Sequence, residues 1–201
     1  DITDRKLAEE EKQNLYDRFN RIASNVPGAI YEFCLHPDGT TSVPYASEGF
    51  SDLYELSPED VKTDATPIYE LIHPDDRESY FKSVSESAEK LTPWYGENRI
   101  ILPSGEIKWV EGKSTPQKLE DGSIIWQGYL NDVTARKLAE ENLRLERSNL
   151  NSVLENMQNG VFFFDEKGEN CWMNAEALRI HGFNSASDML DRFSQYTQEW
   201  E

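Results

Sequence analysis

Apolar and polar residues repeat with two different periods along this chain. From about residue 4 to residue 25, apolar side chains recur at steps of three and four residues, which is typical of one face of a helix. The same spacing returns in residues 135–158. Between these segments, short runs alternate apolar with polar residues and end at Gly, Pro, Asn or Asp, which predicts strands and tight turns. The pattern therefore predicts a β-rich body between two amphipathic helices.

Two strands are expected before a central helical segment and three after it. The five ranges are 29–36, 41–46, 94–102, 107–119 and 124–134. Gly105 and Gly122 stand where tight hairpins need a positive φ. Ser47 and the pair Ser57-Pro58 are expected to open short helices, and the run 73–76 (His-Pro-Asp-Asp) to open a longer one with its acids at the positive end of the helix dipole. This order predicts an α+β fold, a five-stranded antiparallel sheet with helices packed on one face.

A ten-residue phrase occurs twice in the chain. Residues 1–10 read DITDRKLAEE and residues 132–141 read DVTARKLAEE. Thr3 and Thr134 are 131 positions apart, and similar residues continue at this spacing as far as the pair Phe33 and Phe164. Because this spacing is close to the length of one ordinary domain, we expect one full unit, the first part of a second, and the tail of a preceding one at the start.

The order of elements, with its motifs, resembles the PAS sensor family and its C-terminal PAC half. The resemblance is carried by NVPGAIYEF, ASEGFSDLYELSPEDV, LIHPDD, LPSGEIKWVEG and GYLNDVTARKLAEE. It is complete over residues 11–132, whereas residues 159–190 match only the front of a PAS unit. The resemblance implies a linker helix at 1–25 from a preceding PAS unit, a PAS sensor domain at 26–134, a signalling linker helix at 135–158 and a truncated second PAS domain at 159–201.

Charge and composition limit the classes of partner that this chain can bind. The chain has 38 Asp and Glu against 20 Lys and Arg, a formal net charge of −18, and an acidic surface repels nucleic acid and anionic lipid. We therefore expect no nucleic-acid partner and no direct membrane contact. The lack of a long apolar run or signal peptide, with Cys34 and Cys171 as the only cysteines, predicts a cytoplasmic protein.

Catalytic and cofactor chemistry find little support in the sequence. A glycine-rich phosphate loop and a nucleophile elbow are both absent, so we expect no enzyme here and a kinase or cyclase output outside this fragment. Flavin-binding PAS sensors carry a reactive Cys where this chain has Thr66, and polar amides where it has Ile100, Val110 and Leu130. Haem-binding ones carry an axial His on the long helix, whereas His73 precedes that helix. No cofactor is predicted.

Strand alternation turns one set of side chains toward the helices. Two interpretations stay open, namely a filled core and a cavity in which Gly112 and Gly128 leave space for a small molecule. The ligand of such a cavity stays unknown. The candidate pocket residues are Tyr31, Asn98, Ile100, Val110, Trp126 and Leu130.

Asp132 and Thr134 mark the joint between the last strand and the following helix. Either side chain can accept a hydrogen bond from the first free amides of that helix, and a rigid joint would relay a shift of the sheet. The helix carries a seam, interrupted only by Glu146, that consists of Ala139, Leu143, Leu150, Val153 and Met157. The matching stripe at the start of the chain consists of Ala8, Leu15, Phe19, Ile22 and Val26. Each stripe either packs on its own domain or forms a parallel dimeric coiled coil, which would make a homodimer through the linker helices.

The leading hypothesis is a sensory input module of a multidomain signalling protein, above all a sensor histidine kinase of a two-component system. It would relay the state of a ligand or partner through its terminal helices to neighbouring PAS and output domains. One alternative is a ligand-free PAS repeat for dimerisation and spacing. The second alternative is a light or redox sensor that binds flavin or haem. Because the second unit lacks its last three strands, its apolar face at Val161, Phe162 and Phe164 should be uncovered.

Overall fold

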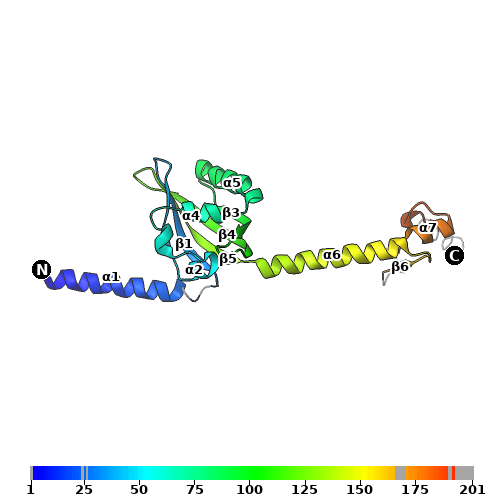
Figure 1. Cartoon of the computed structure of the whole chain (residues 1–201), viewed down its shortest axis with the longest axis horizontal. Helices are drawn as coiled ribbons and strands as arrows, with labels where there is room; N and C mark the ends of the chain where they lie inside the picture. Colours follow the sequence, from blue (N-terminus) through cyan, green and yellow to red (C-terminus); the bar gives the residue numbers. More distant parts are fainter. Residues whose placement is uncertain (1, 24, 26, 166–170, 190–191, 193–201) are drawn as a thin grey trace, which may run out of the picture. The chain divides into compact units, whose positions relative to one another are not determined.

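The structure, a computed structural model, describes residues 2–23, 25, 27–165, 171–189 and 192 (Figure 1). The chain divides into two compact units, Asp1–Lys137 and Leu138–Glu201. The first unit holds α1 (Ile2–Ala23), β1 (Ala29–Leu35), β2 (Thr41–Ala46), α2 (Gly49–Tyr54), α3 (Pro58–Val61), α4 (Thr66–Leu71), the 3-10 turn η1 (Pro74–Asp76), α5 (Arg77–Lys90), β3 (Trp94–Ile101), β4 (Ile107–Lys118) and β5 (Ile124–Asp132). None of the helices formed by the described residues combines the length and apolar character needed to cross a bilayer.

The predicted sheet is confirmed. Its five strands are all antiparallel and follow the order β2-β1-β5-β4-β3. Gly105 and Gly122 adopt φ angles of 88° and 91° in the β3–β4 and β4–β5 hairpins, as their turns require. This order places the last strand, β5, in the middle of the sheet, so the residue that leads into the next helix leaves from the centre.

The helical segment α2 to α5 covers one face of the sheet, and the core lies between them (Figure 1). Ser57 opens α3 with a capping box, because its Oγ accepts from Glu59 N and its own N–H donates to Asp60 Oδ2. The expectation that Ser47 caps a helix in the same way is wrong. Its Oγ accepts instead from Ile30 N at 3.0 Å and ties the start of α2 to β1.

The end of α1 contacts the edge strand β2. The rings of Phe19 and Tyr45 lie 5.4 Å apart, and the Tyr45 hydroxyl donates to Asn20 Oδ1 at 3.1 Å. Leu15 and Ile22, from the first stripe, are exposed. The side chain of Ala8 and residue Val26 lie outside the described part of the chain.

The second unit begins within α6 (Thr134–Asn156) and continues with β6 (Phe162–Phe164), β7 (Cys171–Met173) and α7 (Ala175–His181). Asn174 is fully buried and connects these elements, because its Nδ2 donates to Leu154 O and Asn159 O while its Oδ1 accepts from the amides of Val161 and Ala177. Phe162 and Phe164 are exposed, as expected, whereas Val161 is half-buried.

Candidate functional site

A small cavity lies inside the first unit, between the sheet and the helical segment. Its volume is about 40 Å³. All five strands contribute to its wall, which consists of Tyr31, Phe33, Val43, Phe50, Tyr54, Ile68, Tyr69, Tyr80, Val84, Trp94, Asn98, Val110, Gly112, Ser114, Trp126 and Leu130. The wall contains no Asp, Glu, Lys, Arg or His. The cavity is therefore lined by apolar and aromatic groups with a few neutral polar ones.

Strand alternation located part of this wall. Of the six candidate pocket residues, five line the cavity, and the exception is Ile100. Ile100 is fully buried and forms a bridge to Ile72, ahead of α5. Gly112 lines the cavity, and a Cβ at this position would come within 2.5 Å of the Trp94 ring. The expectation that Gly128 also leaves space for a ligand is wrong, because a Cβ there would lie 1.9 Å from a carbonyl oxygen of β4.

Neutral polar groups face this apolar space. Burial raises the pKa of Tyr31 to about 12 against the opposing influence of the Ser114 hydroxyl, and burial also raises the pKa of Tyr54 and of Tyr80. Ser114 Oγ is buried close to the Tyr31 hydroxyl, but no hydrogen bond of acceptable geometry joins it to a described residue. An unpaired buried hydroxyl costs about 1–3 kcal/mol, so a molecule that supplies its partner would recover that free energy.

Two indole groups on the cavity wall attach α5 to the sheet. Trp94 Nε1 donates to Ser83 Oγ at 3.0 Å, and Trp126 Nε1 donates to Ser87 Oγ at 2.9 Å. The Ser87 hydroxyl in turn donates to Thr92 O at 2.7 Å. The position of α5 is thus coupled to β3 and β5. The sequence contains no local signal for these pairs, because the partners of one of them are 39 residues apart.

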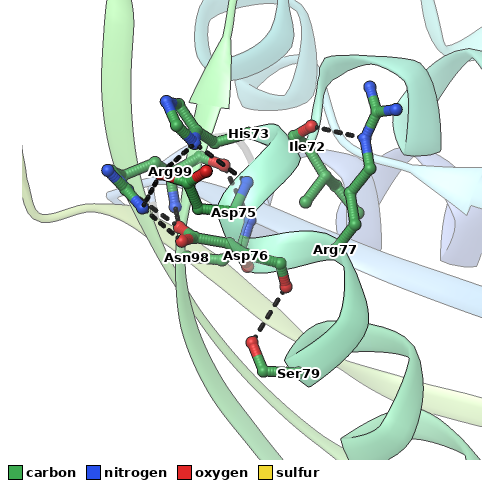
Figure 2. A network of polar contacts seen from close by, with 8 residues as sticks. All are labelled: Ile72, His73, Asp75, Asp76, Arg77, Ser79, Asn98 and Arg99. Atoms are coloured by element: carbon green, nitrogen blue, oxygen red, sulfur yellow. Dashed lines mark hydrogen bonds and ion pairs between the residues drawn. The ribbon is translucent and has the colours of Figure 1, made fainter.

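The loop before α5 is anchored to β3 by the polar network that Figure 2 shows. The guanidinium of Arg99 donates to Asp76 through two of its nitrogens, Nε to Oδ2 at 3.0 Å and Nη2 to Oδ1 at 2.5 Å, and Arg99 N donates to Asp76 Oδ2 at 2.8 Å. His73 opens the turn, as its ring accepts from Asp75 N. The hydrogen bond from Arg99 holds the pKa of Asp76 below its usual range. Asp75 and Asp76 thus lie at the start of the helical segment, as expected, and the Asp76 carboxylate binds β3 and makes no side-chain cap bond to α5.

Asp132 and Thr134 hold the strand-to-helix joint from two sides. Asp132 Oδ1 accepts from Thr134 N at 2.9 Å, at the first residue of α6. Thr134 Oγ1 accepts from Trp109 N at 2.9 Å, and Val133 N donates to Trp109 O at the same distance. Asp132 thus caps the helix, whereas the Thr134 hydroxyl takes the place of a carbonyl in the ladder with β4.

The first turn of α6 is also clamped by charges, which the sequence did not reveal. Glu97 forms ion pairs with Lys137 and with Arg136, whose Nη2 lies 2.8 Å from Glu97 Oε1. These three residues form the Glu97 clamp. The hydrogen bond from Lys137, followed by those from Tyr95 and Arg136, lowers the pKa of Glu97 to about 2. Lys137 Nζ also lies 5.2 Å from the centre of the Trp109 ring, so the start of α6 is held to both β3 and β4.

The seam on α6 is open in the structure. Its largest members, Leu143, Leu150, Val153 and Met157, are 67%, 59%, 61% and 40% exposed. Ala139 is exposed as well. Among the described residues of the second unit, nothing covers these side chains.

Metal ligands do not gather anywhere in the described residues. No three His, Cys, Asp or Glu side chains there form a group that could hold a metal ion.

Sequence comparison finds PAS proteins in both units. The profile of the PAS fold family matches residues 43–130, and that of a PAS domain family matches residues 148–201. The chain is 31% identical over 136 residues to the methyl sulfide methyltransferase-associated sensor of Methanosarcina acetivorans, a match that covers 67% of the chain and 13% of that protein. It is 25% identical over 185 residues to the probable diguanylate cyclase DgcE of Escherichia coli K12, covering 91% of the chain and 16% of that protein. The chain thus spans less than a fifth of these relatives, at 13% and 16%.

Structure comparison agrees. A crystal structure of the sensory box histidine kinase/response regulator from Burkholderia thailandensis matches with a TM-score of 0.51 and 25% identity, and the match covers 66% of this chain and 97% of that one. Both units carry a PAS match and the first has the complete five-stranded sheet, so the chain belongs to the PAS domain family.

Proposed function

We propose that this chain is a cytoplasmic sensory input module whose cavity state is relayed through α6 to neighbouring PAS and output domains. The observation that carries this proposal is the course of β5. Trp126 and Leu130 of this strand line the cavity, and two residues after Leu130 the strand ends at Asp132, which caps α6. The cavity wall at Leu130 is therefore only two residues away from the residue that caps α6.

The neighbouring strand supports the same route. Val110 and Gly112 of β4 line the cavity, and the adjacent Trp109 bonds both Val133 and the hydroxyl of Thr134. Because side chains alternate along a strand, a displacement of β4 moves the cavity wall and the joint together. The strand that leads into α6, β5, and its neighbour β4 thus both form part of the wall.

The output lies in other parts of the protein in this proposal. The two curated relatives are named as a sensor and as a probable diguanylate cyclase, and the chain covers only 13% and 16% of them. The crystal structure of a histidine kinase from Burkholderia thailandensis supports a sensor histidine kinase as the whole protein. The module itself binds and relays, and carries out no catalysis.

Cavity filling tests the relay in the whole chain. Ser114→Leu places an apolar side chain in the cavity, and we expect it to change amide hydrogen exchange in residues 134–140. Ser123→Leu is the matched control, because the Ser123 hydroxyl is also buried without a hydrogen bond of acceptable geometry among the described residues, and Ser123 does not line the cavity. Unchanged exchange at the start of α6 in a folded Ser114→Leu chain would refute the relay.

A ligand-free spacer repeat is the second candidate, and the cavity volume favours it. Pockets for organic ligands measure about 300–1,000 Å³, far more than the 40 Å³ found here. A spacer predicts that neither serine variant alters the exchange of α6. A visible absorbance band in the purified chain would instead favour a flavin or haem sensor.

We further propose that α6 pairs with the same helix of a second chain through its exposed seam. Glu146 interrupts the seam, and one polar residue at such a position weakens a coiled coil. Glu146→Leu should therefore strengthen dimerisation, and Leu150→Asp should yield monomers. Sedimentation that finds the wild type and Leu150→Asp equally monomeric at high concentration would refute the pairing.

A further inference from the structure

A surface groove adjoins the cavity of the first unit. The groove has a volume of about 710 Å³ and lies among the ends of β1 and β2, α4 and α5. Phe33, Tyr69 and Val84 line the groove and also line the cavity. The two spaces therefore meet at these three side chains.

Tyr69 is the side chain among the three that a hydrogen bond holds in place. Its hydroxyl donates to Thr41 Oγ1 at 2.9 Å, and its ring packs edge-on against the exposed Phe81, with centroids 5.2 Å apart. It is half-buried and stands on α4, a helix of only six residues. Without this hydrogen bond, only packing would hold the ring in place.

We propose that the groove is the entrance to the cavity, that Tyr69 is its gate with Thr41 as the latch, and that the site takes a small neutral molecule with an apolar body and one hydroxyl or carbonyl group. This proposal rests on the proposed function, because it names the entrance and the ligand class of the same cavity. With the gate closed, 40 Å³ holds only water-sized molecules. With the gate open, the groove adds the space that a ligand needs.

The neutral class of ligand follows from the wall. The wall has no charged side chain, and transfer of an unpaired ion into such a space is strongly unfavourable. Tyr31 and Ser114 offer hydroxyls, and Asn98 offers an amide. A hydroxyl or carbonyl on the ligand would pair with the Ser114 hydroxyl, which no hydrogen bond of acceptable geometry joins to a described residue.

The latch predicts how a variant changes affinity. Where only the open state binds, the apparent dissociation constant equals the intrinsic one divided by the open fraction. Loss of one neutral hydrogen bond changes such an equilibrium about fivefold. Thr41→Val removes the acceptor and should therefore lower the apparent dissociation constant about fivefold. Thr41→Ser keeps the hydroxyl and should behave like the wild type.

Benzyl alcohol is a suitable probe, with benzoate and benzylammonium as charged counterparts of similar size. In the whole chain, we expect benzyl alcohol to shift the indole N–H signals of Trp94 and Trp126 in NMR titrations, and the two ions to leave them unchanged. Tyr69→Phe should match Thr41→Val, because it removes the same bond from the other side. Tyr45→Phe is the control, since it loses a comparable bond to Asn20 but lines neither the cavity nor the groove.

Each contrary result removes a different part of the proposal. Equal affinity for benzyl alcohol in the wild type, Thr41→Val and Tyr69→Phe overturns the gate and leaves the cavity as a ligand site. Equal binding of benzoate or benzylammonium overturns the neutral class. No binding even to Tyr69→Ala, with its gate ring removed, overturns the whole proposal. The relay is tested separately, by amide hydrogen exchange at the start of α6 in Ser114→Leu.

Discussion

Glu97→Gln should loosen the start of α6 from the sheet. Glu97 forms ion pairs with Lys137 and Arg136 of the first turn and accepts a hydrogen bond from Tyr95 at 2.7 Å. Gln is similar in size and still accepts a hydrogen bond, but it has no charge to attract the two cations. The substitution therefore removes the electrostatic part of the Glu97 clamp and leaves most of the packing.

The expected loss follows from the pKa of the carboxyl group. Its hydrogen bonds lower the pKa of Glu97 from 4.5 to about 2. At about 1.4 kcal/mol for each pKa unit, this difference sets a ceiling of about 3.5 kcal/mol. The side chains of Glu97, Lys137 and Arg136 are 18%, 24% and 43% exposed, so water screens the charges. We expect a loss of about 1–2 kcal/mol in the free energy of unfolding.

The dependence on pH gives the sharpest check. Because the pKa of Glu97 is lower in the folded state, its stabilisation is present above pH 4.5 and is lost as the pH falls toward about 2. Urea unfolding of wild type and Glu97→Gln should differ at neutral pH and converge in acid, and exchange in residues 134–140 should follow. Equal stability at neutral pH, or a difference that persists in acid, would refute this reasoning. Glu141→Gln is the control, because its pair with Arg144 is exposed and should contribute nothing measurable.

Three further substitutions test the cavity wall and its anchors. Gly112→Ala places a Cβ 2.5 Å from an indole carbon, and urea unfolding should show a loss of about 1–3 kcal/mol. Asp76→Asn weakens the paired hydrogen bonds with Arg99, and the pKa of Asp76 is lowered, so its destabilisation should be full at neutral pH and fade in acid in unfolding curves. Thr134→Val leaves Trp109 N–H without its acceptor, and hydrogen exchange at that amide should accelerate as the chain loses about 1–3 kcal/mol.

The strands and hairpins could be predicted from the sequence because their signals are local. Alternation gave β2 at its observed bounds, and glycine stands at both hairpin positions with a positive φ. The partners of two hydroxyls could not be predicted in the same way. Ser47 and Thr134 both stand beside helix starts, yet they bond amides 17 and 25 residues away in sequence. Sequence spacing cannot show which free amide a folded sheet brings nearest.

The sequence predicts which side chains of the strands face the cavity, but it does not predict the volume of the cavity. Alternation identifies which side chains of a strand point to the core, and it placed five of the six candidates on the wall. It does not show how far along the core a side chain lies from the cavity. Ile100 was therefore grouped with the wall residues, although it lies beside Ile72. Tyr54 and Tyr80 were missed because they belong to α2 and α5. Their approach to the sheet depends on how the helices dock.

A small resting cavity is compatible with a binding site, because its polar groups suit water. A buried water needs about 10–15 Å³ and two to four polar partners, and 40 Å³ therefore accommodates about three or four waters beside Tyr31, Asn98 and Ser114. A ligand hydroxyl that reproduces those hydrogen bonds displaces the water at little enthalpic cost, while its apolar body gains the aromatic wall. A charged ligand gains neither these hydrogen bonds nor the contact of an apolar body with the aromatic wall. The same wall that makes the cavity too small for a cofactor of flavin size thus selects for compact neutral molecules, and it does so on the two strands that hold α6.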